Sequence, residues 1–244
     1  MNRIVLAALL LTATIGTGCT HAMRITNLDE FRPAPTAPLQ PARTVGLTSR
    51  NLSDPASRRY IDAIADGLRR DATYDRVLYP CDGAQQKDVD VVYDISVVPT
   101  YGAQGTNFFV NWPGFLIFAP AIWGYGYTAD LQTSVAIRTR DGATQQLQLP
   151  AKFTFRQAEF DRTWTEIGWL EIGIIPLIGG MAFTQYDPDV TQEFQTRVAP
   201  DYGSYVAQRA REALAAMPPG APPPAPPAPA AAAAPAAPAA VPNS

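Results

Sequence analysis

The chain has 244 residues, a formal net charge of −3 and a single histidine, His21. An acidic balance argues against a general nucleic-acid binder, which carries a basic surplus. The shortage of histidine argues against Ser-His-Asp and Cys-His active sites and against a zinc site, because imidazole supplies the base or the metal ligand there. We therefore expect no cofactor and no metal.

The first 18 residues predict a secretory signal peptide. Arg3 supplies the basic start, residues 4–15 are almost wholly apolar, and small residues follow up to Gly18. The apolar stretch is too short for a membrane span. At about 1.5 Å per helical residue it reaches roughly 18 Å, whereas a bilayer core is about 30 Å thick.

Cys19 follows the small residues directly, and this arrangement resembles the lipobox of bacterial lipoproteins. In that family the cysteine becomes the first residue of the mature protein and carries its acyl chains. Thr20, rather than Asp, after the cysteine is similar to the outer-membrane address of such lipoproteins. The resemblance implies a lipid anchor on the periplasmic face of the outer membrane. Gly16 departs from the family, which has Leu, Val or Ile there, so ordinary cleavage after Ala22 is the alternative.

Residues 19–41 predict a Pro-rich tether between the anchor and the folded domain. Prolines recur from Pro33 to Pro41 and break helices and strand ladders. A spacer of this kind lifts a domain off the membrane. The alternative is that the segment packs across the domain surface. We expect the folded domain to span residues 42–216.

Hydrophobic periodicity predicts alternating strands and helices within that domain. Asp54 and Pro55 mark a helix start, as N-cap and first helical residue. Asp141-Gly142 is a strong hairpin signal, and Pro150 marks an edge or a bulge in the strand that follows. The expected elements are strands at 43–47, 74–79, 89–97, 131–139 and 145–155, a helix from Pro55, and a helix over 202–214 with Pro200 near its start and Pro218-Pro219 as its stop.

This order predicts an α+β fold, in which helices pack on one face of a mainly antiparallel sheet. In element order it resembles the small α+β domains of curli-secretion and synthase-activator lipoproteins, over roughly residues 42–214. The resemblance implies a periplasmic lipoprotein module.

Two largely apolar segments do not fit a plain sheet-and-helix domain. An aromatic insert at 102–129 interrupts the strands, and a second apolar segment covers 160–186. Their amphipathic aromatic residues suit a protein interface or a membrane headgroup boundary. The alternative is that the two segments pack together as additional core. The residues predicted to form the contact surface are Trp112, Phe115, Phe118, Trp123 and Tyr125.

Other candidate sites have simpler explanations. Asp88, Asp90 and Asp94 could bind calcium, but a solvated strand face explains them better. Once Cys19 is acylated, Cys81 has no partner in the chain, so we expect a buried free thiol, with a disulfide between chains as the alternative. Four acidic residues lie in or next to the aromatic-rich start of the second apolar segment and would suit sugar chemistry only as a suitably spaced pair. They are Glu159, Asp161, Glu166 and Glu171.

Residues 217–244 are almost only Pro and Ala and predict a disordered or polyproline-like tail. Together these features predict a non-catalytic envelope interaction or assembly module. It is held at the membrane by its N-terminal lipid and bound to an envelope protein, as a monomer or an oligomer. The alternatives are a subunit of a membrane-inserted oligomer and an enzyme that uses carboxylates alone on a cell-wall substrate.

Overall fold

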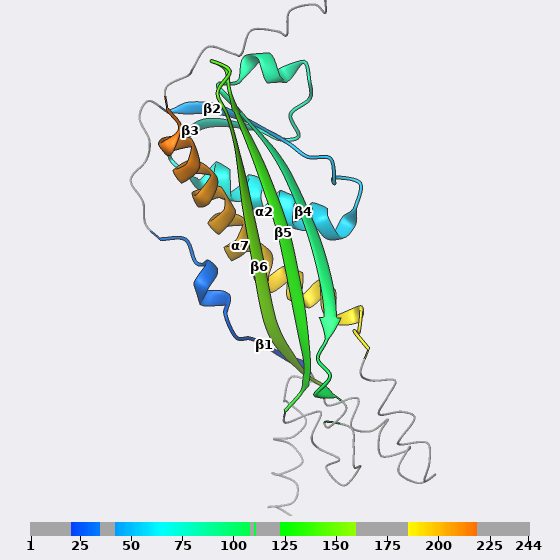
Figure 1. Ribbon diagram of the computed structural model, residues 1–244. Coiled ribbons are helices and arrows are strands. Elements are labelled where there is room, and N and C mark those ends of the chain that lie inside the picture. Colours follow the sequence, from blue (N-terminus) through cyan, green and yellow to red (C-terminus); the bar gives the residue numbers. More distant parts are fainter. Residues whose placement is uncertain (1–20, 35–41, 108–109, 111–122, 160–184, 219–244) are drawn as a thin grey trace, which may run out of the picture.

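The computed structural model describes residues 21–34, 42–107, 110, 123–159 and 185–218. These residues form two layers, a six-stranded sheet and a pair of long helices that cover one of its faces (Figure 1). The other face, toward the viewer in Figure 1, carries no helix among the described residues, and we call it the open face. The elements in chain order are β1 (His21–Ile25), η1 (Leu28–Phe31), β2 (Arg43–Thr48), α2 (Pro55–Arg70), β3 (Tyr74–Leu78), η2 (Gln85–Asp88), β4 (Val91–Ala103), β5 (Tyr125–Thr139), β6 (Thr144–Glu159) and α7 (Asp189–Ala216).

The predicted α+β architecture is confirmed, although the sheet is mixed. Its strand order is β1-β6-β5-β4-β2-β3. The first four strands in this order are antiparallel neighbours, whereas β2 runs parallel to both β3 and β4. α2 connects β2 to β3 and carries the chain back along the sheet to the end where β2 began. β3 can therefore run in the same direction as β2, as in other helix crossovers between parallel strands.

Burial alternates along the strands and separates a core face from the open face. Tyr93, Ile95 and Val97 of β4 are fully buried on the helix side. Asp94 and Ser96, which lie between them, are only half-buried on the open face. The same period of two continues through β5 and β6, so one face of the sheet builds the core and the other meets solvent.

The predicted hairpin at Asp141-Gly142 joins β5 to β6. Gly142 has a φ of 88°, a left-handed conformation that glycine adopts without a Cβ penalty. Pro150 lies within β6, which pairs with β5 on one side along nearly its whole length. On the other side, β1 pairs with β6 only from Phe155 onward. Among the described residues, no strand pairs with β6 on that side at Pro150, in agreement with the predicted edge position.

α2 begins where the sequence predicts. The Asp54 carboxylate accepts hydrogen bonds from the backbone N–H groups of Ala56 and Ser57, at 3.2 Å each, and Pro55 is the first helical residue. The hydrogen bond from the Ser57 hydroxyl, and then these backbone bonds, lower the pKa of Asp54 against the effect of desolvation. The charged cap satisfies N–H groups that have no partner within the helix.

Folded structure begins at β1, before the expected start at Ala42. β1 pairs with the end of β6, and the buried ring of Phe31 in η1 lies 4.5 Å from that of Phe153 and 5.3 Å from that of Tyr205. The predicted tether over 19–41 is therefore wrong for residues 21–34, which pack across the domain. The sequence did not predict β1, because a strand of five residues is too short to show a clear hydrophobic periodicity. The prolines that follow it were therefore the stronger signal.

α7 begins earlier than predicted. Pro200 lies inside it, whereas the sequence placed this proline near the helix start. A proline in a helix interior removes one backbone hydrogen bond. The turns before it bury apolar side chains such as Phe194 in the core, and this burial outweighs the local cost. The predicted stop before Pro218 is confirmed, because α7 ends at Ala216.

Candidate functional site

Four strand ends meet at one end of the sheet, at the bottom of Figure 1, which we call the anchor end. β1 starts there at His21, opposite Glu159, the last residue of β6. β4 ends there at Ala103, which lies opposite Tyr127, and β5 begins two residues earlier at Tyr125. Cys19 lies outside the described residues, but β1 begins two residues after it. The predicted lipidation site is therefore joined to this end of the sheet with no spacer.

The predicted contact residues that the structure describes, Trp123 and Tyr125, differ in exposure. Trp123 has 51% of its surface exposed and precedes β5. Tyr125 is fully buried, because alternate residues of β5 face the helices and Tyr125 is one of these. Its assignment to an exposed contact surface is therefore wrong. Trp112, Phe115 and Phe118 lie outside the described residues.

A side-chain amide supports the start of β5. The Asn107 side chain accepts a hydrogen bond from the Gly126 N–H at 2.6 Å and donates one to the Gly126 carbonyl at 2.9 Å. The amide thus takes the place of a strand neighbour for this one residue. A pocket of about 370 Å³ opens beside it, and Trp123 and Arg156 contribute to its lining.

Aromatic rings close the anchor end on the helix side. Tyr186, just before α7, stacks on Tyr101 with ring centroids 5.4 Å apart and meets Tyr127 edge-on at 5.5 Å. Burial raises the pKa of Tyr186 to about 12. The Tyr101 hydroxyl lies 3.1 Å from that of Tyr60 and accepts a hydrogen bond from Gln195 at 3.1 Å. These phenols are neutral, hydrogen-bonded parts of the core.

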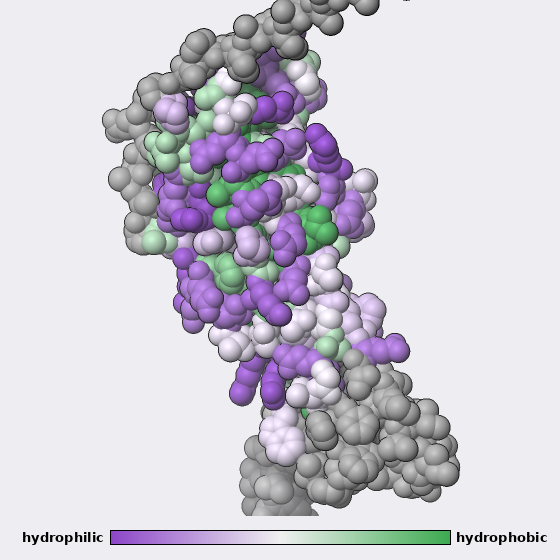
Figure 2. Space-filling model, viewed as in Figure 1, coloured by the Kyte–Doolittle hydropathy of each residue, from purple (hydrophilic) through white to green (hydrophobic). Residues whose placement is uncertain are grey.

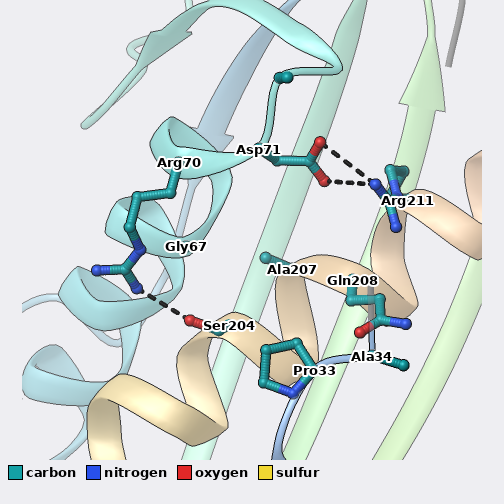
Figure 3. Close-up of a pocket in the computed structure, with 10 residues that line it drawn as sticks. Pro33, Ala34, Gly67, Arg70, Asp71, Ser204, Ala207, Gln208 and Arg211 are labelled. Carbon is teal, nitrogen blue, oxygen red and sulfur yellow. Dashed lines mark hydrogen bonds and ion pairs between the residues drawn. The ribbon is translucent and has the colours of Figure 1, made fainter. Parts of the chain in front are cut away.

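A second pocket, of about 320 Å³, lies between α2 and α7 and away from the anchor end (Figure 3). One Arg211 nitrogen lies 3.2 Å and 3.4 Å from the two carboxylate oxygens of Asp71. The Arg211 and Asp71 side chains are only 8% and 13% exposed. On the other side of the pocket, Arg70 donates a hydrogen bond to the Ser204 hydroxyl at 2.9 Å. These contacts join the two helices, so the polar groups of this pocket already have partners within the protein.

The three carboxylates considered as calcium ligands are not gathered at one point. Asp88 lies in η2, and Asp90 accepts a hydrogen bond from the Thr44 N–H at 2.8 Å and lies 3.7 Å from Arg140. Asp94 is on the open face of β4. Within the described ranges, no three His, Cys, Asp or Glu side chains come close enough to hold a metal ion. Asp161, Glu166 and Glu171, proposed for sugar chemistry, lie outside those ranges, as does the side chain of Glu159.

Cys81 is buried against Gly46 of β2, and the predicted burial is confirmed; among the described residues its thiol forms no disulfide. It packs so closely that a Cβ on Gly46 would lie 2.6 Å from its sulfur. Burial, and then the charge of Asp82, raise the pKa of the thiol. A protonated, buried thiol is a poor nucleophile, so this cysteine does not supply a reactive site.

Sequence comparison finds no relative for this chain, since no protein-family model and no curated protein matches it. In the part of the chain that the structure describes, neither α2 nor α7 combines the length and apolar character needed to cross a bilayer. Among solved structures, a minor lipoprotein from Acinetobacter baumannii is similar at 10% identity and a TM-score of 0.28, over 64% of this chain and 90% of that one. Rare lipoprotein B from Shewanella oneidensis is similar at 9% identity and a TM-score of 0.27, over 63% of this chain and 94% of that one.

Proposed function

We propose that this chain is an outer-membrane lipoprotein that serves as a non-catalytic interaction or assembly module of the cell envelope. Acyl chains on Cys19 hold it to the periplasmic face of the membrane. One observation carries the proposal: β1 starts two residues after Cys19 and pairs with the end of β6, at the same end of the sheet as the exposed Trp123. An exposed tryptophan beside a lipid anchor suits the headgroup boundary, where its ring is apolar and its N–H finds a polar partner.

The position of β1 supports a defined orientation on the membrane. A long spacer would let the domain tumble, whereas Thr20 alone separates Cys19 from the first strand. α7 runs away from the anchor end over 28 residues, or about 42 Å at 1.5 Å per residue. The C-terminal end of α7 therefore lies on the side of the domain remote from the anchor end (Figure 1). In this arrangement the far side faces the periplasm, and the anchor end, with Trp123, faces lipid or a membrane-bound partner.

The pocket between α2 and α7 and the phenols near the anchor end support a non-catalytic role. Asp71 and Arg211 pair with each other, and the phenols near the anchor end are hydrogen-bonded within the core. A general base or nucleophile needs a free group with a suitable pKa, and these groups are already engaged.

Mass spectrometry of the mature N-terminus tests the anchor. The wild-type chain should yield an acylated peptide that begins at Cys19, and the protein should fractionate with outer membranes. The Cys19→Ser variant should show neither property. A mature chain that begins at Met23 would refute the proposal, and it would also remove His21 and Ala22 from their pairing with β6.

Photo-crosslinking in intact cells tests the contact. A photoreactive phenylalanine at Trp123 should crosslink to lipid or to one discrete envelope protein. Val98 is a matched control, because it is 49% exposed but lies on the open face of β4, away from the anchor end. The same crosslinked products from both positions would show that the anchor end makes no specific contact.

A further inference from the structure

We infer that Arg24 and Arg156 form, together with Trp123, a binding site for the phosphate of a phospholipid headgroup. The inference rests on the proposed function, because the membrane around the acylated chain is the source of this ligand. It adds a specific polar contact, made by named side chains, to the non-specific hold of the acyl chains.

The two arginines lie side by side on the open face near the anchor end. Arg24 of β1 is the direct partner of Arg156 in the antiparallel pairing with β6. Opposite residues in such a pair share a face of the sheet, with Cβ atoms about 5 Å apart. Both arginines are exposed, whereas the preceding pair, Met23 and Gln157, is buried on the helix side. Figure 2 shows strongly hydrophilic side chains that project from the open face near the anchor end.

The arginine pair carries an uncompensated charge. Like charges directly opposite each other on neighbouring strands destabilise a sheet. Among the described residues, neither Arg24 nor Arg156 has a side-chain hydrogen bond or an ion pair. Further along β6, Lys152 lies opposite Asp130 of β5, so that positive charge has a carboxylate beside it. A bound anion would relieve the repulsion between the two guanidinium groups.

The pocket beside Arg156 has the size and lining for a headgroup. The cross-strand partner of Arg156 in β5 is Gly126, and both residues line the pocket. The indole of Trp123 lines the same pocket of about 370 Å³. Arginine binds phosphate through two parallel N–H···O hydrogen bonds, and its guanidinium is weakly hydrated, so it suits a site that is partly shielded from water.

The location favours a lipid over a soluble anion. Arg24 lies five residues after Cys19, so at about 3.3 Å per residue it is within about 17 Å of the acylated residue. A tilt of the domain brings the arginine side chains, which reach several ångströms further, to the headgroup layer. The anchor also keeps the site at a high local concentration of headgroups, whereas a soluble phosphate must be captured from dilute solution.

Titration of the full, acylated chain with short-chain lipids tests the site. The chain, in neutral maltoside micelles, is titrated with dihexanoyl phosphatidylglycerol, dihexanoyl phosphatidylcholine or inorganic phosphate, and binding is followed by phosphorus NMR. Wild type should bind the phosphatidylglycerol at least tenfold more tightly than the other two. Two basic side chains favour its net negative charge over the neutral phosphatidylcholine, and the micelle that holds the acyl anchor concentrates the lipid, but not inorganic phosphate, beside the site. The Arg24→Gln/Arg156→Gln variant should lose this preference. Arg138→Gln, at an exposed position on the open face of β5, should keep it.

Three results would overturn the inference. Equal binding of phosphatidylglycerol and inorganic phosphate would show that the site does not select a lipid. Equal binding of phosphatidylglycerol by wild type and the double variant would show that the two arginines do not form the site. A lower melting temperature of the double variant without ligand would show that the arginines stabilise the fold, whereas loss of an opposed like-charge pair should leave it unchanged or slightly higher. A missing acyl group on Cys19 refutes the proposed function, while loss of lipid preference in an acylated chain refutes this inference alone.

Discussion

The crossing of α2 and α7 depends on glycine, and replacing Gly203 by Ala tests how closely the two helices approach. A Cβ at Gly203 would lie 2.5 Å from the backbone carbon and 2.6 Å from the carbonyl oxygen of Ala63, and 2.8 Å from the nitrogen of Ile64. These are backbone atoms of α2, which cannot rotate away as a side chain can. Since carbon atoms pack at about 3.5 Å or more, the helices would have to separate by about 1 Å.

Two effects of opposite sign decide the magnitude. Alanine is a better helix former than glycine, which favours the variant by about 0.5–1 kcal/mol. Overpacking a close-packed core costs about 1–3 kcal/mol. Gly203 is buried at the crossing, and its partner Gly67 would also place a Cβ only 2.9 Å from the Gly203 carbonyl oxygen. The packing cost should therefore exceed the gain in helix propensity, and the free energy of unfolding should fall by about 1–2 kcal/mol.

Urea unfolding followed by circular dichroism measures this change. Gly83→Ala is the matched control, because a Cβ there meets no atom within 4 Å, and its free energy of unfolding should change by less than about 0.5 kcal/mol. If Gly203→Ala is as stable as the wild type or more stable, the backbones of α2 and α7 do not approach as closely as described, and the reasoning fails.

Two further predictions concern buried polar groups. Asp71→Asn should leave the buried Arg211 without a carboxylate and lower the free energy of unfolding by about 3–5 kcal/mol. Adding Arg211→Met should recover much of this loss, and a double variant as unstable as the single one would contradict the buried pair. Burial raises the pKa of Tyr74 and of Tyr202 to about 12 from the ordinary value of 10.0. Because the unfolded chain releases these protons first, stability should hold below pH 10 and decline from pH 10 toward pH 12. Urea midpoints measured across this range test it, and a flat profile would mean that the phenols are solvated.

Local patterns in the sequence predicted those elements whose signals are themselves local. Asp54 and Pro55 mark the start of α2 because a cap and a first-turn proline act within one helical turn. The Asp141-Gly142 turn predicted the β5–β6 hairpin for the same reason, since its backbone geometry suits only a few residue types. By contrast, β1 and the first turns of α7 take their stability from contacts with distant residues, and their short or Pro-containing sequences did not reveal them.

The candidate site shows the same division. The sequence identified an aromatic insert, but it could not separate the exposed Trp123 from the buried Tyr125, because that difference depends on where β5 begins. Arg24 and Arg156 carry no signal in the sequence for a related reason. They are far apart in the chain, and only the register of β1 against β6 places them opposite each other.

By itself, the sequence determined the class of fold, the places of most strands and helices, and the resemblance of Cys19 and its preceding residues to a lipobox. These depend on periodicity, turn chemistry and a short processing motif, all of which act over a few residues. Only the tertiary structure decided that the chain from His21 is a strand rather than a spacer, and that this strand starts at the same end of the sheet as Trp123. Strand pairing decides such positions, because its register is set by the core as a whole.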